Sequence, residues 1–253
     1  MKNQYSLSLL QAFIFLAFSS ATFAQLTGVK TIPGDYLTIA AAITDLNASG
    51  VGTGGVSFNV AANYTETGMM PVITATGTVN NTIIFQKSGT GTNPTITAGT
   101  GIGTMDGIII LQGTDYITFD GINLEANTAN TTATTQAEWG FALLKASATN
   151  GSQNVLIKNC RIILSSTNTT SVGIYSANHT PAAITALTVS DISGTNSYNN
   201  FHNNIIVGAY NGISLLGFNS ITYYDIFNEV GVLGANTIAN FGGGAATAKG
   251  IYT

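Results

Sequence analysis

Short runs of alternating apolar and polar residues, separated by corners rich in Gly, Asn and Ser, fill most of the chain after residue 50. The clearest example lies between Gly107 and Leu124, where three β-strand segments fit into one short stretch. Alternation also predicts strands at residues 56–60, 82–86 and 95–97. Many β-branched residues among many turn formers are typical of an all-β protein with short strands.

The alternating pattern returns at long intervals. A Gly followed by an inward-facing apolar residue recurs at steps of 33, 33, 39 and 38 residues. The apolar members of this series are Ile108, Phe141, Ile174, Ile213 and Ile251. A period of two within each strand, repeated over several tens of residues, predicts a solenoid whose coils keep their apolar side chains inside.

A second apolar pattern has steps of two, three and two residues, as a strand, a corner and another strand require. It comprises Ile117, Phe119, Ile122 and Leu124; Val155, Ile157, Cys160 and Ile162; and, in part, Leu187, Val189 and Ile192; Phe201, Asn204 and Ile206; and Leu233, Asn236 and Ile238. Between Ile174 and Ile213 the pattern has two competing starting points, Leu187 and Phe201. The sequence leaves both open, and one of them belongs to an insertion or an additional strand.

A single amphipathic pattern precedes the strands, at residues 35–46. Its apolar face consists of Ile39, Ala42, Ile43 and Leu46. The spacing predicts an α-helix with Asp35 as its N-cap and Gly50 just past its end. Such a helix needs an apolar surface to cover, and the open end of a stacked β core is one, so we expect it to cap the solenoid.

The first residues carry the pattern of a secretory signal peptide. Lys2 is followed by an apolar run from Leu7 to Phe18 and by small residues that favour cleavage after Ala24. The run is shorter than the ~20 residues of a transmembrane helix. We therefore expect a protein that is secreted or displayed at the cell surface, with no transmembrane segment in the mature chain.

These patterns divide the chain into three parts: the signal peptide at 1–24, a leading segment with the capping helix at 25–55, and β-helix coils at 56–253. The last residues read as the start of a new coil, without a closing helix or polar cap. The C-terminal end is therefore expected to be uncapped, and the chain to be the N-terminal piece of a longer protein.

Charge narrows the classes of partner. The mature chain keeps six Lys and Arg against eleven Asp and Glu, which leaves a formal net charge of −5. An acidic chain without a basic patch argues against nucleic acid and anionic membranes as partners. The single cysteine, Cys160, stands between apolar pairs and is expected to be a buried thiol.

Several phrases of the sequence resemble a known fold class. The helix YLTIAAAI, the strand VSFNVAANYTE, the stretch YITFDGINL and the later NCRI, GISLLG, NTIANF and GIY resemble secreted bacterial right-handed parallel β-helix proteins of the pectin-lyase-like class. The resemblance implies an all-β fold, a right-handed parallel β-helix (β-solenoid) with an N-terminal capping α-helix. That class includes polysaccharide lyases, glycosidases, esterases and many non-catalytic surface proteins, so the fold alone does not fix the activity.

Three charged residues are the candidates for catalysis. Lys158 and Arg161 flank Cys160 on the outward side of the pattern, and Asp120 falls one coil away on the same face. A surface ion pair is the ordinary interpretation of this group, and we favour it. Glycosidases need two carboxyl groups ~5–9 Å apart, whereas the acids here are scattered. No metal-binding motif is present, no cofactor is expected, and calcium enters only if the chain is a lyase.

Two other signals have a structural alternative. Tyr64 and Glu66 match part of the G-x-Y-x-E motif of pectin methylesterases, but the remaining motifs of that family are missing and Asp225 stands alone. We expect Tyr64 and Glu66 to shape the first coil. The aromatic residues considered for stacking on sugar rings, with packing under loops as the alternative, are Trp139, Tyr210, Tyr223 and Tyr224.

The leading hypothesis is therefore a non-catalytic secreted or cell-surface β-helix module that serves in adhesion, glycan binding or as a structural scaffold. Its expected partner is a polysaccharide or a cell-surface glycan. The alternative is a polysaccharide lyase or glycoside hydrolase that acts on an acidic polysaccharide such as pectin.

Overall fold

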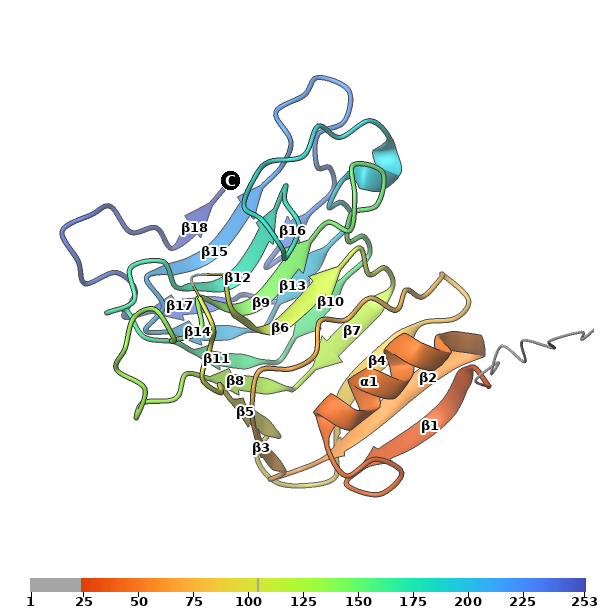
Figure 1. Cartoon of the computed structure of the whole chain (residues 1–253). Coiled ribbons are helices and arrows are strands. Elements are labelled where there is room, and N and C mark those ends of the chain that lie inside the picture. The colour runs from red at the N-terminus through yellow and green to blue at the C-terminus, as the bar shows by residue number, and fades with distance from the viewer. Residues whose placement is uncertain (1–23, 104) are drawn as a thin grey trace, which may run out of the picture.

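The computed structural model describes residues 24–103 and 105–253, and within them the chain forms one α-helix, one short 3₁₀-helix and three parallel β-sheets (Figure 1). The predicted signal peptide lies outside the described residues except for Ala24. Strands of the three sheets alternate along the chain, and each pairs in parallel with its counterparts in the coils before and after it. This arrangement is a parallel β-helix and confirms the predicted all-β solenoid.

The strands of each sheet stack in chain order. The first sheet contains β1 (Leu26–Ile32), β2 (Val51–Ala61), β4 (Ile83–Ser88), β7 (Ile117–Asp120), β10 (Leu156–Lys158), β13 (Asn200–His202) and β16 (Glu229–Val230). The second contains β3 (Thr65–Thr67), β5 (Thr95–Thr97), β8 (Asn123–Glu125), β11 (Arg161–Ile163), β14 (Ile205–Val207) and β17 (Thr237–Ala239). The third contains β6 (Gly107–Gln112), β9 (Trp139–Leu144), β12 (Val172–Ala177), β15 (Asn211–Leu216) and β18 (Ile251–Tyr252).

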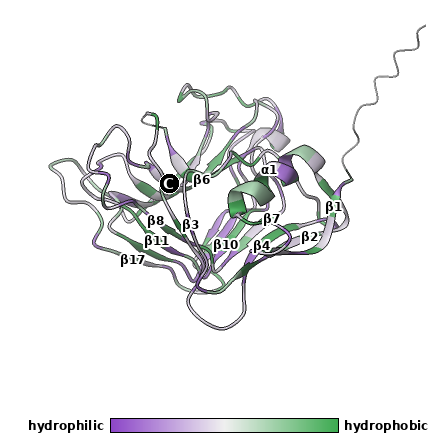
Figure 2. Ribbon diagram, turned by 60° about the horizontal axis from the view of Figure 1, so that its bottom comes forward, coloured by the Kyte–Doolittle hydropathy of each residue, from purple (hydrophilic) through white to green (hydrophobic). Residues whose placement is uncertain are grey.

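Apolar side chains form columns between the sheets. In Figure 2 the strands of the first and second sheets diverge from a shared corner. The rings of Phe58, Phe85 and Phe119 stack in successive coils, with centroids 4.5 and 5.5 Å apart. Phe141 of the third sheet tilts against Phe119 at 5.1 Å. All four side chains are buried, and burial of each contributes roughly 1.5–3 kcal/mol. The coil register follows from this stacking, because a slip of one residue would turn the rings outward.

The second apolar pattern gives the register of β7 and β8 against β10 and β11 correctly. Phe119 pairs with Ile157, and Leu124 pairs with Ile162. Ile157 in turn pairs with Phe201, which settles the choice that the sequence left open. Leu187 lies in an insertion between β12 and β13 that also carries the 3₁₀-helix η1 (Ile192–Gly194).

The Gly-containing series is correct from Phe141 onward but wrong by one residue at its start. Phe141 pairs with Ile109, so Ile108 takes the place that Gly140 has in the next coil. A Cβ on Gly140 would lie 2.5 Å from the Gly173 carbonyl oxygen and 2.6 Å from the Cγ2 atom of Ile162, so glycine is needed there.

Leu233 was also misplaced. Val230, not Leu233, pairs with Phe201, and Leu233 is 68% exposed. The extra residues form a turn in which Gly231 has a φ of 80° and its N–H bonds to Phe201. Asn236 occupies its predicted place. Its side-chain oxygen accepts from the Asn204 N–H, and its side-chain amide donates to the Phe201 carbonyl.

The capping helix α1 (Ile39–Ser49) lies against the start of the first sheet (Figure 1), and its predicted apolar face is buried in the main core. Its N-cap is Thr38, not the predicted Asp35, whose carboxylate bonds to Thr31. Gly50 ends the helix with a φ of 69°, as predicted. The Glu66 carboxylate accepts the free N–H groups of Ile39 and Ala40 at 2.7 and 3.1 Å.

Strands β6, β9 and β12 of the third sheet are buried on both faces, unlike the strands of the other two sheets. A second apolar cluster covers the outer side of the third sheet and is formed by Ile110, Trp139, Ala142, Leu144, Val172 and Ala177. Loops that follow β9, β12 and β15 lead the chain back to the first sheet.

Candidate functional site

The structure brings two of the three predicted catalytic residues together. Asp120 and Lys158 occupy paired positions of β7 and β10, and the Lys158 Nζ lies 3.1 Å from the Asp120 Oδ2. The Asn159 side chain donates to the other carboxylate oxygen at 2.6 Å. Both charged side chains are about 30% exposed. Lys158 and Asp120 therefore form an ordinary surface ion pair.

Arg161 belongs to a different pair. It lies on β11 of the second sheet, where its guanidinium is 3.3 Å from the carboxylate of Glu125. The corner at Asn159 and Cys160 separates it from Lys158. The three predicted residues thus form two ion pairs on two sheets rather than one cluster.

His202 extends the Asp120–Lys158 row by one strand, since it pairs with Lys158 in the register of β10 and β13. Its Nδ1 is 2.8 Å from the Asn200 side-chain oxygen. Burial, followed by the nearby Lys158 charge, lowers the pKa of His202 below 6.5, while Asp120 acts in the opposite direction. The imidazole is consequently neutral at pH 7.

Tyr64 and Glu66 have a structural role. The Tyr64 hydroxyl donates to the Glu66 carboxylate at 3.0 Å, and that carboxylate is already held by two N–H groups of α1. Hydrogen bonding to Glu66, after burial, raises the pKa of Tyr64 to about 12. The partial esterase motif therefore fastens the first coil to the capping helix.

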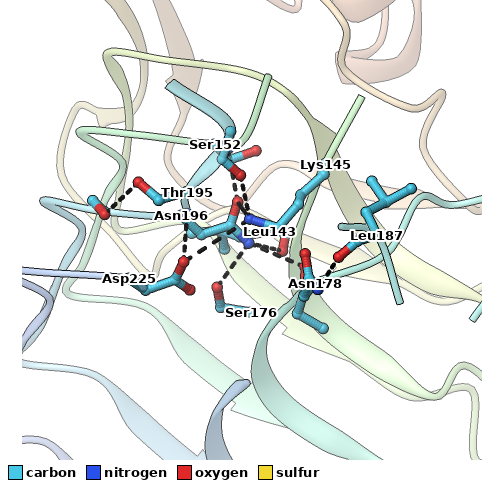
Figure 3. Close-up of polar contacts among 12 residues, drawn as sticks. Leu143, Lys145, Ser152, Ser176, Asn178, Leu187, Thr195, Asn196 and Asp225 are labelled. Carbon is cyan, nitrogen blue, oxygen red and sulfur yellow. Dashed lines mark hydrogen bonds and ion pairs between the residues drawn. The ribbon is translucent and has the colours of Figure 1, made fainter. Parts of the chain in front are cut away.

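A buried polar cluster lies where loops following three strands of the third sheet meet (Figure 3). Lys145 directly follows β9, and its side chain is fully buried. Its Nζ donates to the Gly194 carbonyl and lies 3.4 Å from the Asn196 Oδ1. Asp225, from the loop between β15 and β16, is 3.9 Å from the same nitrogen and accepts from the Asn196 N–H at 2.9 Å.

Asn196 is the centre of this cluster. Its side-chain oxygen accepts from the Ser152 N–H at 2.9 Å, and its amide donates to the Leu143 carbonyl and the Ser176 hydroxyl, both at 3.1 Å (Figure 3). The residue thereby joins β9, β12 and the insertion between β12 and β13. A complete network of this kind fixes the positions of the loops that it connects.

Burial opposes both charges of the cluster. Burial lowers the pKa of Lys145, and the attraction of Asp225 works against that shift. Burial likewise raises the pKa of Asp225, opposed by Lys145 and by the Asn196 N–H. All neighbours of the Lys145 nitrogen named above are acceptors, so the protonated amine fits the cluster and balances the carboxylate.

Two pockets flank Phe218, which follows β15. The first has a volume of about 400 Å³ and is lined by Leu215, Gly217, Phe218, Tyr224, Asp225, Phe227, Asn228 and Thr253. The second has a volume of about 390 Å³ and is lined by Tyr175, Ala177, Asn178, His179, Ile184, Ala186, Leu216, Gly217, Phe218 and Asn219. Aromatic rings, side-chain amides and a single carboxylate form these walls. Lys145 lies behind the first pocket and holds that carboxylate.

The second pocket contains an unsatisfied acceptor. Asn178 is only 8% exposed, and its Nδ2 donates to the Leu187 carbonyl at 2.7 Å. Its Oδ1 has no hydrogen-bond partner among the described residues. Beside it, the Tyr175 hydroxyl is 3.0 Å from the His179 Nε2. The pocket thus combines aromatic surface with groups that bond to hydroxyls.

Of the four aromatic residues considered from the sequence, two pack as the structural alternative expects. Trp139 is 5% exposed and stacks on Tyr175 at 4.7 Å, and Tyr210 is buried with its hydroxyl bonded to Ala246. Tyr223 is half-buried, whereas Tyr224 is 52% exposed and lines the first pocket.

Sequence reasoning missed Lys145 and Phe218 and gave Asp225 no partner. A signal for Lys145 was present, because a lysine that directly follows the entirely apolar strand WGFALL is in a buried context. Phe218 had no such signal, since its surroundings depend on the conformation of two non-repeating loops.

The described residues, 24–103 and 105–253, contain no group of three or more His, Cys, Asp or Glu side chains placed to hold a metal ion. Within the same residues no helix has both the length and the apolar character to cross a membrane. Comparison of the chain with protein-family models, curated proteins and solved structures found no match.

Proposed function

We propose that the chain is a secreted or cell-surface β-helix module of the pectin-lyase-like class that binds carbohydrate without cleaving it. The observation that carries the proposal is the pair of pockets on either side of Phe218. Their volumes of about 400 and 390 Å³ fall in the range of small-ligand sites. Secretion is supported by the signal-peptide pattern at the start of the sequence.

The chemistry of the walls favours a sugar. The C–H faces of a sugar ring pack on aromatic side chains such as Phe218 and Tyr224, and its hydroxyls bond to amides such as those of Asn178 and Asn228. The only carboxylate in the walls, that of Asp225, is held by Lys145 and by a backbone N–H. It is therefore poorly placed to exchange a proton with a substrate, which favours binding over cleavage.

A glycan array probed with the full chain tests the proposal. We expect binding to a subset of glycans, and we expect Phe218→Ala to remove it, because this ring forms a wall of both pockets. Val79→Ala is the matched control, since Val79 is 71% exposed in a turn outside both pockets. An array without any signal would contradict the proposal, and so would binding that Phe218→Ala leaves intact.

A polysaccharide lyase or glycosidase is the second candidate, supported by the row of Asp120, Lys158 and His202 on adjacent strands. A neutral His202 is able to accept a proton. Assays of polygalacturonate cleavage distinguish the two functions. Turnover by the full chain that disappears in Asp120→Asn would refute the non-catalytic function and support this alternative.

A further inference from the structure

Four equivalent positions, one in each of four successive coils, have left-handed backbone conformations. Tyr116, Asn154, Tyr198 and Phe227 have φ values of 51°, 56°, 62° and 55° and lead into β7, β10, β13 and β16. Their equivalence follows from the hydrogen bonds between coils. The N–H groups of Tyr116, Asn154 and Tyr198 bond to the carbonyls of Gln153, Ser197 and Ile226, each the residue before the next member.

Large aromatic residues are unusual in this conformation, which glycine and asparagine adopt more easily. Asn154 shows that asparagine fits this corner. Local backbone preference therefore does not explain Tyr198 and Phe227. Backbone strain of this kind is concentrated at functional sites, where the surrounding structure maintains it.

Tyr198 and Phe227 form one exposed aromatic surface. Their rings stack with centroids 5.4 Å apart and an angle of 23° between their planes. Tyr198 is 43% exposed and Phe227 is 72% exposed. Phe227 also lines the pocket on the Asp225 side of Phe218, so the aromatic surface begins at the pocket and continues onto the preceding coil.

The charged side chains of the pocket wall and of β16 are of one sign. Asp225 in the pocket wall and Glu229 on β16 are acidic, and Asn200 donates to the Glu229 carboxylate at 2.6 Å. No Lys or Arg is among the residues that line either pocket. The nearest amine in the cluster, that of Lys145, is fully buried. Because an anionic sugar would meet only acidic groups and amides here, the surface suits an uncharged ligand.

We infer that the ligand is an uncharged oligosaccharide, with one end in the pocket between Phe218 and Phe227 and its further sugar units along Phe227 and Tyr198. The inference rests on the proposed carbohydrate binding and adds the charge of the ligand and its direction across the coils. An aromatic surface that extends beyond the pocket has area for more units than the pocket alone. Affinity is therefore expected to rise with chain length.

Titration calorimetry of the full chain with defined oligosaccharides tests this inference. The probes are neutral cello-, xylo- and manno-oligosaccharides of two and of six sugars, and galacturonic acid oligosaccharides of the same lengths. We expect at least one neutral six-sugar ligand to bind more tightly than its two-sugar form, and the acidic series to bind more weakly than the neutral one.

Tyr198→Asn is the informative variant, because asparagine suits the backbone there, as Asn154 shows, and Tyr198 does not line the pocket. The loss of one ring should weaken six-sugar binding about tenfold and leave two-sugar binding unchanged. Val79→Asn changes an exposed apolar position outside the pocket lining and should change neither. Far-ultraviolet circular dichroism of both variants checks that the fold is retained.

The outcomes separate the two proposals. If glycans bind but Tyr198→Asn leaves the ratio of six-sugar to two-sugar affinity unchanged, the inference is wrong and the proposed function stands. Tighter binding of galacturonic acid oligosaccharides would also overturn it. If the full chain binds no glycan at all, the proposed function fails, and the inference fails with it.

Discussion

Replacing Lys145 by methionine tests whether the buried cluster holds the loops of the site together. The change removes a buried ammonium whose partners are the Gly194 carbonyl, the Asn196 Oδ1 and the Asp225 carboxylate. At the observed 3.9 Å, two unit charges attract each other by about 4 kcal/mol with an effective dielectric constant of about 20. Without the lysine, the Asp225 carboxylate stays buried and unpaired.

Removing one partner of a buried ion pair typically costs about 3–5 kcal/mol, and we expect this loss in the free energy of unfolding for Lys145→Met. Asp225→Asn should be less damaging. The amine then keeps two acceptors, and because burial already lowers the pKa of Lys145, it is able to lose its proton. In the double variant no unpaired carboxylate remains, so we expect a favourable coupling of about 1–3 kcal/mol.

Guanidinium titrations of the four proteins measure these differences. Trp139 is the only tryptophan of the chain, is buried, and lies on the strand that leads into Lys145, so its fluorescence reports unfolding close to the cluster. Circular dichroism follows the remaining coils, and the two probes should give the same midpoint if unfolding is two-state. A loss below about 1 kcal/mol for Lys145→Met, or additivity within about 0.5 kcal/mol, would refute the reasoning.

Two further predictions concern the capping helix and the row of charged residues on the first sheet. Glu66→Ala removes the acceptor for the first N–H groups of α1, and we expect it to cost about 1–3 kcal/mol of unfolding free energy; Glu125→Ala, which disrupts only an exposed ion pair, is the control and should change stability by less than about 1 kcal/mol. His202 has a pKa below 6.5 in the fold, so the stability it contributes is complete at neutral pH and is lost as the pH falls through that lowered pKa. The denaturation midpoint of the wild type relative to that of His202→Gln should therefore decrease between pH 7.5 and 5, and a difference that does not change with pH would contradict this expectation.

The coils were predictable because their information is local and periodic. Phe119 and Leu124 belong to a pattern whose steps of two, three and two describe a strand, a corner and a strand, and the same pattern at Ile157 and Ile162 fixes which residues stack. The errors occurred where equal spacing in the sequence does not correspond to equivalent positions in successive coils. At Leu233, the extra residues of a turn leave a leucine at the spacing of the pattern, but this leucine lies outside the core.

The site was not predictable by the same reasoning, because its residues lie in loops that are not part of the repeat. Lys145, Asn196 and Asp225 follow different strands and meet only because three loops of unlike length come together. No period relates these residues.

The corner at Tyr198 and Phe227 was predictable only in part. The repeat determines the left-handed conformation of the position, and Asn154 shows that asparagine satisfies that requirement, so the backbone geometry follows from the fold. The aromatic rings do not follow from it, because they add strain at the corner and little burial. A residue that opposes the preference of its own position, and is not compensated by packing, is where a repeat protein is expected to carry its specific function.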